Sequence, residues 1–256
     1  MSRATSEGLV VVKMPSAMLL AAEVRSVAAR RALSAEFLGT LLLTFFTAGV
    51  VIVTGGMLGE RLSSSRLLVT AMAHGLAFGL LVFTMAGISA GHLNPVLTLG
   101  AVIMRQMTLA RGLMYLVAQL VGAVCGAVLL KLALPGVPVS LGVPALGPRV
   151  TAEAALVVEG VLAFTLTAVF LASVGKGSVP VVVGLTTALG RLFGMALTGA
   201  PMNPALVFGV ALASGMWTGH WVWWLGPLLG SALAAMCWHA WFSKGEKHSG
   251  DARAWR

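Results

Sequence analysis

Residues 89–98 read SAGHLNPVLT and residues 199–209 read GAPMNPALVFG. Each stretch places an Asn-Pro pair inside a long apolar segment, where burying an unpaired Asn is costly and Pro interrupts a helix. Asn is, however, a favoured N-cap, and Pro suits the first helical position because no N–H is needed there. Each pair is therefore predicted to begin a short helix, at Pro95 and at Pro204.

The composition of the 256-residue chain places these pairs in a membrane. The chain is 58% hydrophobic and 10% charged, and its mean hydropathy is +0.95, whereas about a quarter of the residues of a soluble domain are charged. A helix needs about 20 apolar residues to cross the hydrocarbon core. The weakly charged stretches predict six spans, at about 37–59, the first part of 67–104, 112–130, 154–175, 179–197 and 221–241.

Two of the uncharged stretches are too long for the spans that they contain. Residues 67–104 carry no Lys, Arg, Asp or Glu, and neither do residues 192–243. Each stretch leaves about half a span over, and each half-span begins at an Asn-Pro pair. Irregular backbone at membrane depth is tolerated only where protein buries it or where it lines a water-filled cavity. We therefore expect both half-helices to border such a cavity.

The two halves of the chain repeat each other. AEFLGTLLLTFFTAG (35–49) resembles VEGVLAFTLTAVFLA (158–172), with Glu36 opposite Glu159, and HLNPVLTLG resembles PMNPALVFG. Each copy holds three spans and one half-span, and because three is odd the second copy must be inverted in the membrane. We predict an all-α membrane protein with six transmembrane helices and two re-entrant half-helices in inverted repeats.

The repeats also divide the chain. We expect a basic N-terminal tail at 1–32, a channel domain at 33–243 and a C-terminal tail at 244–256. Within the channel domain, repeat one covers about 33–131, a loop follows at 132–151, and repeat two covers about 152–243.

The net charge of +9 is interpreted as an orientation signal. If the N-terminus is cytoplasmic, 12 of the 17 Lys and Arg residues lie on the cytoplasmic side. This bias predicts that both termini are cytoplasmic, and a nucleic-acid partner is not expected. Whether the vacuolar or the plasma membrane holds the protein stays open.

The half-helices predict a function. Each brings about half a positive charge to its N-terminus, and the capping leaves the amide NH₂ groups of Asn94 and Asn203 to point into the cavity as donors. Two such ends near the midplane repel cations and offer fixed donors to the oxygen of water. This arrangement predicts a pore for small neutral molecules with a barrier to protons.

These features together resemble the aquaporin, or major intrinsic protein, family over about 35–242. The segments AHGLAFGLLVF, GAPMNPA and GHWVWWLGPLLGS are most similar to the tonoplast intrinsic proteins of plants. The resemblance implies a passive channel, not an enzyme, for water and small neutral solutes such as glycerol, urea and ammonia. It also implies a homotetramer in the lipid bilayer, with no cofactor and no metal.

The resemblance also implies a site. The constriction would comprise Asn94, Pro95, Val96, Asn203, Pro204 and Ala205, with Val96 in place of the usual alanine. By the family's spacing, the selectivity filter falls on His74, Arg191, Ala200 and Leu206. Leu206 stands where water channels carry arginine, and Arg191 is unusual in the fifth span, so the filter departs from the strict water-channel pattern.

Some of these roles have alternatives. Arg191 could enter the pore or reach back to the membrane interface, and His74 could line the pore or pack within the bundle. The buried acids Glu36 and Glu159 could hold the half-helix loops, or they could serve a proton-coupled secondary transporter, which is the alternative function. The other candidate groups are interpreted as structural, without a disulfide or metal site: His92, His239, Cys125 and Cys237.

Overall fold

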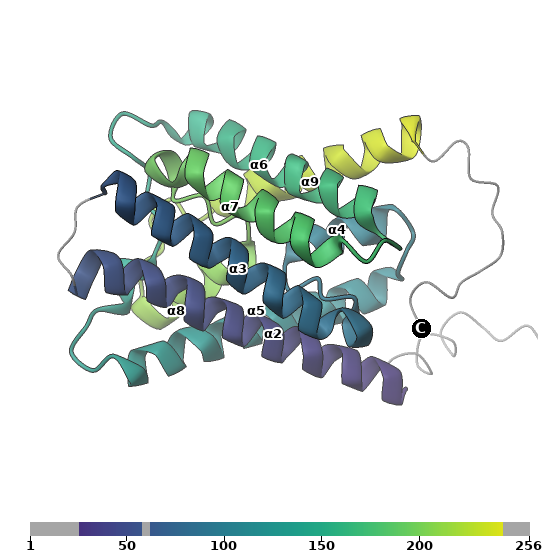
Figure 1. The fold of residues 1–256 in the computed structure, drawn as a ribbon, viewed down its shortest axis with the longest axis horizontal. Coiled ribbons are helices and arrows are strands. Elements are labelled where there is room, and N and C mark those ends of the chain that lie inside the picture. Colours follow the sequence, from purple (N-terminus) through teal and green to yellow (C-terminus); the bar gives the residue numbers. More distant parts are fainter. Residues whose placement is uncertain (1–25, 58–61, 243–256) are drawn as a thin grey trace, which may run out of the picture.

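The computed structural model describes residues 26–57 and 62–242, and these residues are helical with no β-strand among them (Figure 1). A π-helical turn, η1 (Val53–Met57), extends the first helix, and a 3-10 helix, η2 (Val139–Gly142), lies in the loop between the repeats. The α-helices are α2 (Val27–Ile52), α3 (Ser64–Ser89), α4 (Pro95–Ile103), α5 (Leu109–Ala133), α6 (Ala152–Ser173), α7 (Val179–Thr198), α8 (Pro204–Ser214) and α9 (Val222–Trp241).

The two half-helices begin at the predicted prolines. The side chain of Asn94 accepts a hydrogen bond from Val96 N at 2.9 Å, and that of Asn203 accepts one from Ala205 N at 3.1 Å. α4 has 9 residues and α8 has 11, so at 1.5 Å per residue they are about 14 and 17 Å long, roughly half of the hydrocarbon core.

Each of the six predicted spans corresponds to a long helix. In the described part of the chain, five helices are long and apolar enough to cross a membrane, and they contain α2, α3, α5, α6 and α7. The sixth, α9, has 20 residues, which also suffices to cross the core.

The predicted boundary between tail and channel at residue 33 does not coincide with the start of a helix. α2 already begins at Val27, because Ser26 caps it by accepting from Ala29 N at 3.0 Å. Residues 27–32 therefore form the first turns of α2, with Arg30 and Arg31 exposed. The rest of both predicted tails, 1–25 and 244–256, lies outside the described residues.

The packing of the helices follows the repeat. α2 packs along α5 in repeat one, as α6 packs along α9 in repeat two, and α3 packs along α7 between the repeats. Each half-helix packs against the last long helix of the other repeat, α4 on α9 and α8 on α5. In Figure 1 the half-helices occupy opposite ends of the bundle, and α2 begins at the end where α9 finishes.

Glycines permit the closest of these contacts. Gly126 of α5 faces the backbone oxygen of Leu41 in α2, and Gly230 of α9 faces the backbone oxygen of Gly160 in α6. A Cβ at either glycine would overlap that oxygen. Small residues of this kind let membrane helices approach closely, so the same device fixes the equivalent helix pair in each repeat.

Candidate functional site

The tips of α4 and α8 meet inside the bundle through an exchange of hydrogen bonds. Asn94 Nδ2 donates to the backbone oxygen of Met202 at 2.9 Å, and Asn203 Nδ2 donates to the backbone oxygen of Leu93 at 2.9 Å. Leu93 and Met202 both adopt left-handed backbone conformations, with φ of 49° and 50°, which are uncommon for such side chains. Each amide uses one N–H in this exchange and keeps one, because the NH₂ group has two donors.

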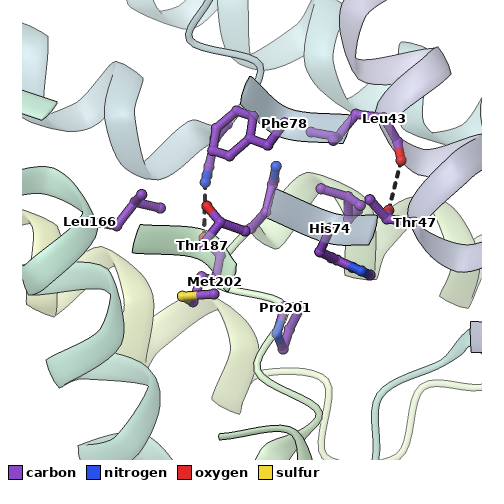
Figure 2. Close-up of a pocket in the computed structure, with 11 residues that line it drawn as sticks. Leu43, Thr47, His74, Phe78, Leu166, Thr187, Pro201 and Met202 are labelled. Carbon is purple, nitrogen blue, oxygen red and sulfur yellow. Dashed lines mark hydrogen bonds between the residues drawn. The ribbon is translucent and has the colours of Figure 1, made fainter. Parts of the chain in front are cut away.

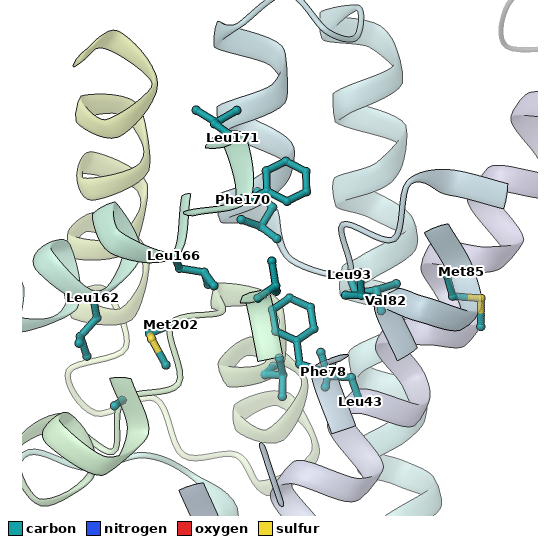
Figure 3. Close-up of a cluster of buried hydrophobic side chains, with 14 of the residues drawn as sticks. Leu43, Phe78, Val82, Met85, Leu93, Leu162, Leu166, Phe170, Leu171 and Met202 are labelled. Carbon is teal, nitrogen blue, oxygen red and sulfur yellow. The ribbon is translucent and has the colours of Figure 1, made fainter. Parts of the chain in front are cut away.

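Apolar side chains surround this crossing. Leu93 and Met202 belong to one buried cluster that includes Phe78, Leu166 and Phe170 (Figure 3). Because this cluster is apolar, the hydrogen bonds between the two loops lie in surroundings of low polarity, where they are stronger than in bulk solvent.

A narrow cavity lies beside the two asparagines, and Figure 2 draws the residues that line it. The space that the centre of a water molecule can occupy in it is about 10 Å³. Its wall is largely apolar, with a few polar groups, which suits small neutral molecules better than ions. The lining residues are Leu43, Thr47, His74, Phe78, Asn94, Leu166, Thr187, Pro201, Met202, Asn203 and Leu206.

Of the predicted constriction, the structure places only the two asparagines on the cavity wall. Val96 is fully buried, and its backbone oxygen accepts from Ser231 Oγ in α9 at 2.7 Å. The other predicted members, Pro95, Pro204 and Ala205, are also buried at the helix starts and do not line the cavity. The extra bulk of Val96 therefore lies in the helix packing.

Arg191 points into the bundle and not toward the membrane interface. Its side chain is 6% exposed. Its guanidinium donates to the backbone oxygen of Gly199 and to the ring of His74, which comes from α3. The structure thus brings two of the predicted filter residues into direct contact, and His74 also lines the cavity.

The other two predicted filter residues differ in their access to the cavity. Leu206 lines it, as expected. Ala200 is fully buried, packs against Gly194 and is not part of the lining. Its N–H donates to Thr198 Oγ1 at 3.1 Å, so the side chain of Thr198 holds its place in the loop.

Glu36 holds the first half-helix loop. Its carboxylate accepts from the backbone N–H groups of His92 at 3.0 Å and Leu93 at 2.7 Å. It also accepts from Ser89 Oγ and from Gln119 Nε2, both at 2.7 Å. Four donors converge on this buried carboxylate, so it acts as a backbone anchor.

Glu159 holds the second loop with fewer bonds. Its Oε1 accepts from Thr198 Oγ1 at 2.6 Å, and that hydroxyl in turn accepts from Ala200 N. Pro201 stands two residues before Asn203, where the first loop has His92 two residues before Asn94, and a proline has no N–H to donate. The loop is therefore tied to Glu159 through Thr198.

A second, wider cavity of about 660 Å³ opens where α5 begins and α6 ends. It is lined by His92, Tyr115 and Phe170, among others. His92 Nδ1 lies 3.1 Å from Thr98 Oγ1, and its ring meets those of Tyr115 and Phe170 edge-on. His92 was interpreted as structural from the sequence, yet it also borders this cavity, two residues from Asn94.

The remaining candidate groups lie away from both cavities. Cys125 and Cys237 are half-buried free thiols, and His239 is exposed near the end of α9.

Thr47 and Thr187 are cavity residues that the sequence reasoning missed. The spacing of Thr187 could have indicated its place: it precedes Arg191, a predicted filter residue, by four residues, so the two share one face of α7.

The fold and site define a helical membrane protein in which two re-entrant half-helices border a narrow cavity. The chain belongs to the major intrinsic protein family, which it matches over residues 23–238. It is 37% identical to aquaporin TIP4-2 of Zea mays, over 85% of this chain and 87% of that protein. It is 39% identical to the human lens fiber major intrinsic protein, over 84% of this chain and 82% of that one.

Two further comparisons concern a relative and a solved structure. The chain is 38% identical to mouse aquaporin-4 over 80% of its own length, and this match spans 65% of the mouse protein. Among solved structures, the aquaglyceroporin from Plasmodium falciparum has a similar fold, with a TM-score of 0.72 at 22% identity, covering 82% of this chain and 95% of that one.

Proposed function

We propose that this chain is a passive membrane channel for water and small neutral solutes that excludes protons and other ions, and that it is not an enzyme. The observation that carries the proposal is the narrow cavity on which Asn94 and Asn203 present their amides from two half-helix tips. Membership of the major intrinsic protein family supports it.

The selection of neutral molecules rests on fixed donors and positive dipole ends. The capped tips of α4 and α8 each carry about half a positive charge, and each asparagine retains one N–H for the oxygen of a passing water. A water that accepts from both amides has its own hydrogens turned away from them. This orientation interrupts proton transfer along a single file of water molecules in the pore. Cations are repelled by the same two ends.

Arg191 would supply the fixed positive charge of the filter from α7. Leu206 occupies the place after the second Asn-Pro pair where the family's water channels carry arginine, and it cannot provide charge or donors. The guanidinium of Arg191, held by Gly199 and His74, lies at the His74 end of the cavity. We assign the filter to His74, Arg191 and Leu206, with Ala200 behind it.

The proton-coupled transporter finds no support in the buried acids. Glu36 accepts four hydrogen bonds from groups that shape the first loop, and Glu159 accepts from Thr198 in the second. Both carboxylates are fully buried. These contacts favour a static structural role over alternating protonation.

We further propose a homotetramer in which each subunit has its own pore, with both termini in the cytoplasm. Large apolar side chains are exposed along the outer faces of the helices, including Leu76, Phe83 and Val157, and such faces suit contact with lipid or with neighbouring subunits. Native mass spectrometry from detergent tests the subunit number: a mass of four chains is expected, and a conducting monomer would contradict it.

The function is tested by side-by-side vesicle assays. Reconstituted protein should accelerate the osmotic response to water and to at least one of glycerol, urea and ammonia, without passing ions. Comparing reconstituted vesicles with protein-free vesicles of the same lipids isolates the contribution of the channel. An unchanged osmotic response would contradict the proposal.

A further inference from the structure

Thr187 carries a buried hydroxyl whose bonding differs from that of its neighbours. Threonines inside a helix commonly donate to the backbone oxygen four residues earlier. Thr186 does so to Val182 at 2.7 Å, and Thr47 does so to Leu43 at 2.7 Å. Thr187 Oγ1 finds no hydrogen-bond partner within residues 26–57 and 62–242, although the residue is only 4% exposed.

The position of Thr187 gives this hydroxyl a partner of another kind. Thr187 lines the narrow cavity together with Asn94 and Asn203, and Figure 2 shows it among the lining side chains. It lies one turn, about 6 Å, before Arg191 on the same face of α7. Its side chain therefore lies on the wall of the cavity that His74, the partner of Arg191, also lines.

The rest of the cavity wall is largely apolar, so the polar side chain of Thr187 stands out on it. Leu43, Phe78, Leu166 and Leu206 line the same cavity with apolar atoms, and a buried hydroxyl without a partner is unfavourable. A molecule inside the cavity can satisfy it, because the hydroxyl both donates and accepts.

We propose that Thr187 is a specificity-determining residue, whose hydroxyl binds permeating solutes that carry several donors and acceptors, such as polyols and urea. This inference rests on the proposed channel function and deepens it. A water molecule in single file can bond to the waters before and after it. A larger solute displaces those waters, so each of its polar groups needs a partner on the wall.

The test compares three variants in proteoliposomes by stopped-flow light scattering. Thr187→Val keeps the size of the side chain and removes the hydroxyl, and Thr187→Ser keeps the hydroxyl. The matched control is Thr167→Val, because Thr167 is also fully buried with an unpartnered hydroxyl among the described residues but does not line the cavity. Reconstituted amounts are equalised by quantitative immunoblotting.

We expect Thr187→Val to lower the permeability to glycerol and urea, relative to that to water, by about 2- to 10-fold, the factor of one net hydrogen bond. Thr187→Ser and Thr167→Val should keep the wild-type ratio. An unchanged ratio in Thr187→Val, or an equal loss in Thr167→Val, overturns the inference. A wild-type protein that conducts water but neither solute also overturns it, whereas a wild-type protein that conducts nothing refutes the channel function itself.

Discussion

Asn94 donates a hydrogen bond to the backbone oxygen of Met202, the residue directly before Asn203, and Asn203 returns one to the residue directly before Asn94. The two half-helices therefore fix each other. The same side chains that cap the helices also join them, and the N–H that each amide retains is held in place by these two bonds. Loss of either amide should disturb the stability of the crossing and the conduction together.

Asn94→Asp separates the two roles of Asn94, which caps α4 through its oxygen and donates to Met202 through its amide NH₂. The variant keeps an oxygen for the cap, since Asp caps helices as well as Asn does, but it places a second oxygen against that of Met202. We expect water permeability to fall at least about tenfold, because lost donation and repulsion together exceed about 1.4 kcal/mol. Vesicle light scattering measures this, with Asn94→Ser as the control that keeps a cap without the charge. Wild-type flux in Asn94→Asp would refute the role of the amide.

Arg191→Val tests the origin of the filter charge. The variant removes the guanidinium that contacts Gly199 and His74, so the filter becomes wider and less polar. We expect faster urea and glycerol flux and a measurable proton leak, detected with a pH-sensitive dye trapped in vesicles. Arg191→Lys retains the charge and should leak less. If solute selectivity and proton exclusion both survive in Arg191→Val, the arginine is not a filter residue.

Gly230→Ala tests the close contact between α9 and α6. The added methyl would overlap the backbone oxygen of Gly160, and overpacking of this kind costs about 1–3 kcal/mol. We expect a lower melting temperature in detergent. Gly87→Ala is the matched control, since a Cβ on this helical glycine of α3 meets no described atom within 4 Å apart from the nearby backbone of its own helix. Equal melting temperatures for the two variants would contradict the packing argument.

His220 predicts a pH dependence of stability. It lies in the connection between α8 and α9, where Trp224 Nε1 donates to its Nε2 at 2.9 Å. Burial lowers the pKa of His220 below its ordinary value of 6.5, so the unfolded state takes up the proton first. The contribution of His220 to stability is therefore full above about pH 6.5 and is lost as the pH falls below it.

The measurement for His220 is the melting temperature in detergent from about pH 8 to pH 5. The wild-type protein should lose stability toward the acidic end, and His220→Gln should lose less, because it has no proton to gain there. Parallel curves for the two proteins would show that the histidine does not carry the effect.

Much of the fold could be predicted because its signals are local or repeated. The half-helices follow from Asn-Pro pairs in stretches too long for one span, and the inversion follows from an odd number of spans per repeat. α2 begins at Val27, six residues before the predicted channel domain, because the basic residues 1–32, Arg30 and Arg31 among them, were all assigned to the tail. The cap at Ser26 and the buried Ala29 and Ala32 outweigh those charges.

The site was harder to predict, because its contacts join distant parts of the chain. The family's spacing assigned His74 and Arg191 to one filter but left open where the guanidinium points, which depends on the packing of α3 against α7. The exchange between the asparagines and the carbonyls of Leu93 and Met202 needs both loops in place. Thr187 stands out only when the partners of each buried hydroxyl are known.

The central claim is passive conduction of water, and the most direct test is the temperature dependence of osmotic shrinkage of proteoliposomes under an imposed solute gradient. A channel predicts a flux that is linear in the gradient and unsaturated, with an activation energy below that of protein-free vesicles, and no response to an imposed pH gradient. Saturable flux driven by a pH gradient, with an activation energy no lower than that of the lipid alone, would contradict the account and favour a transporter.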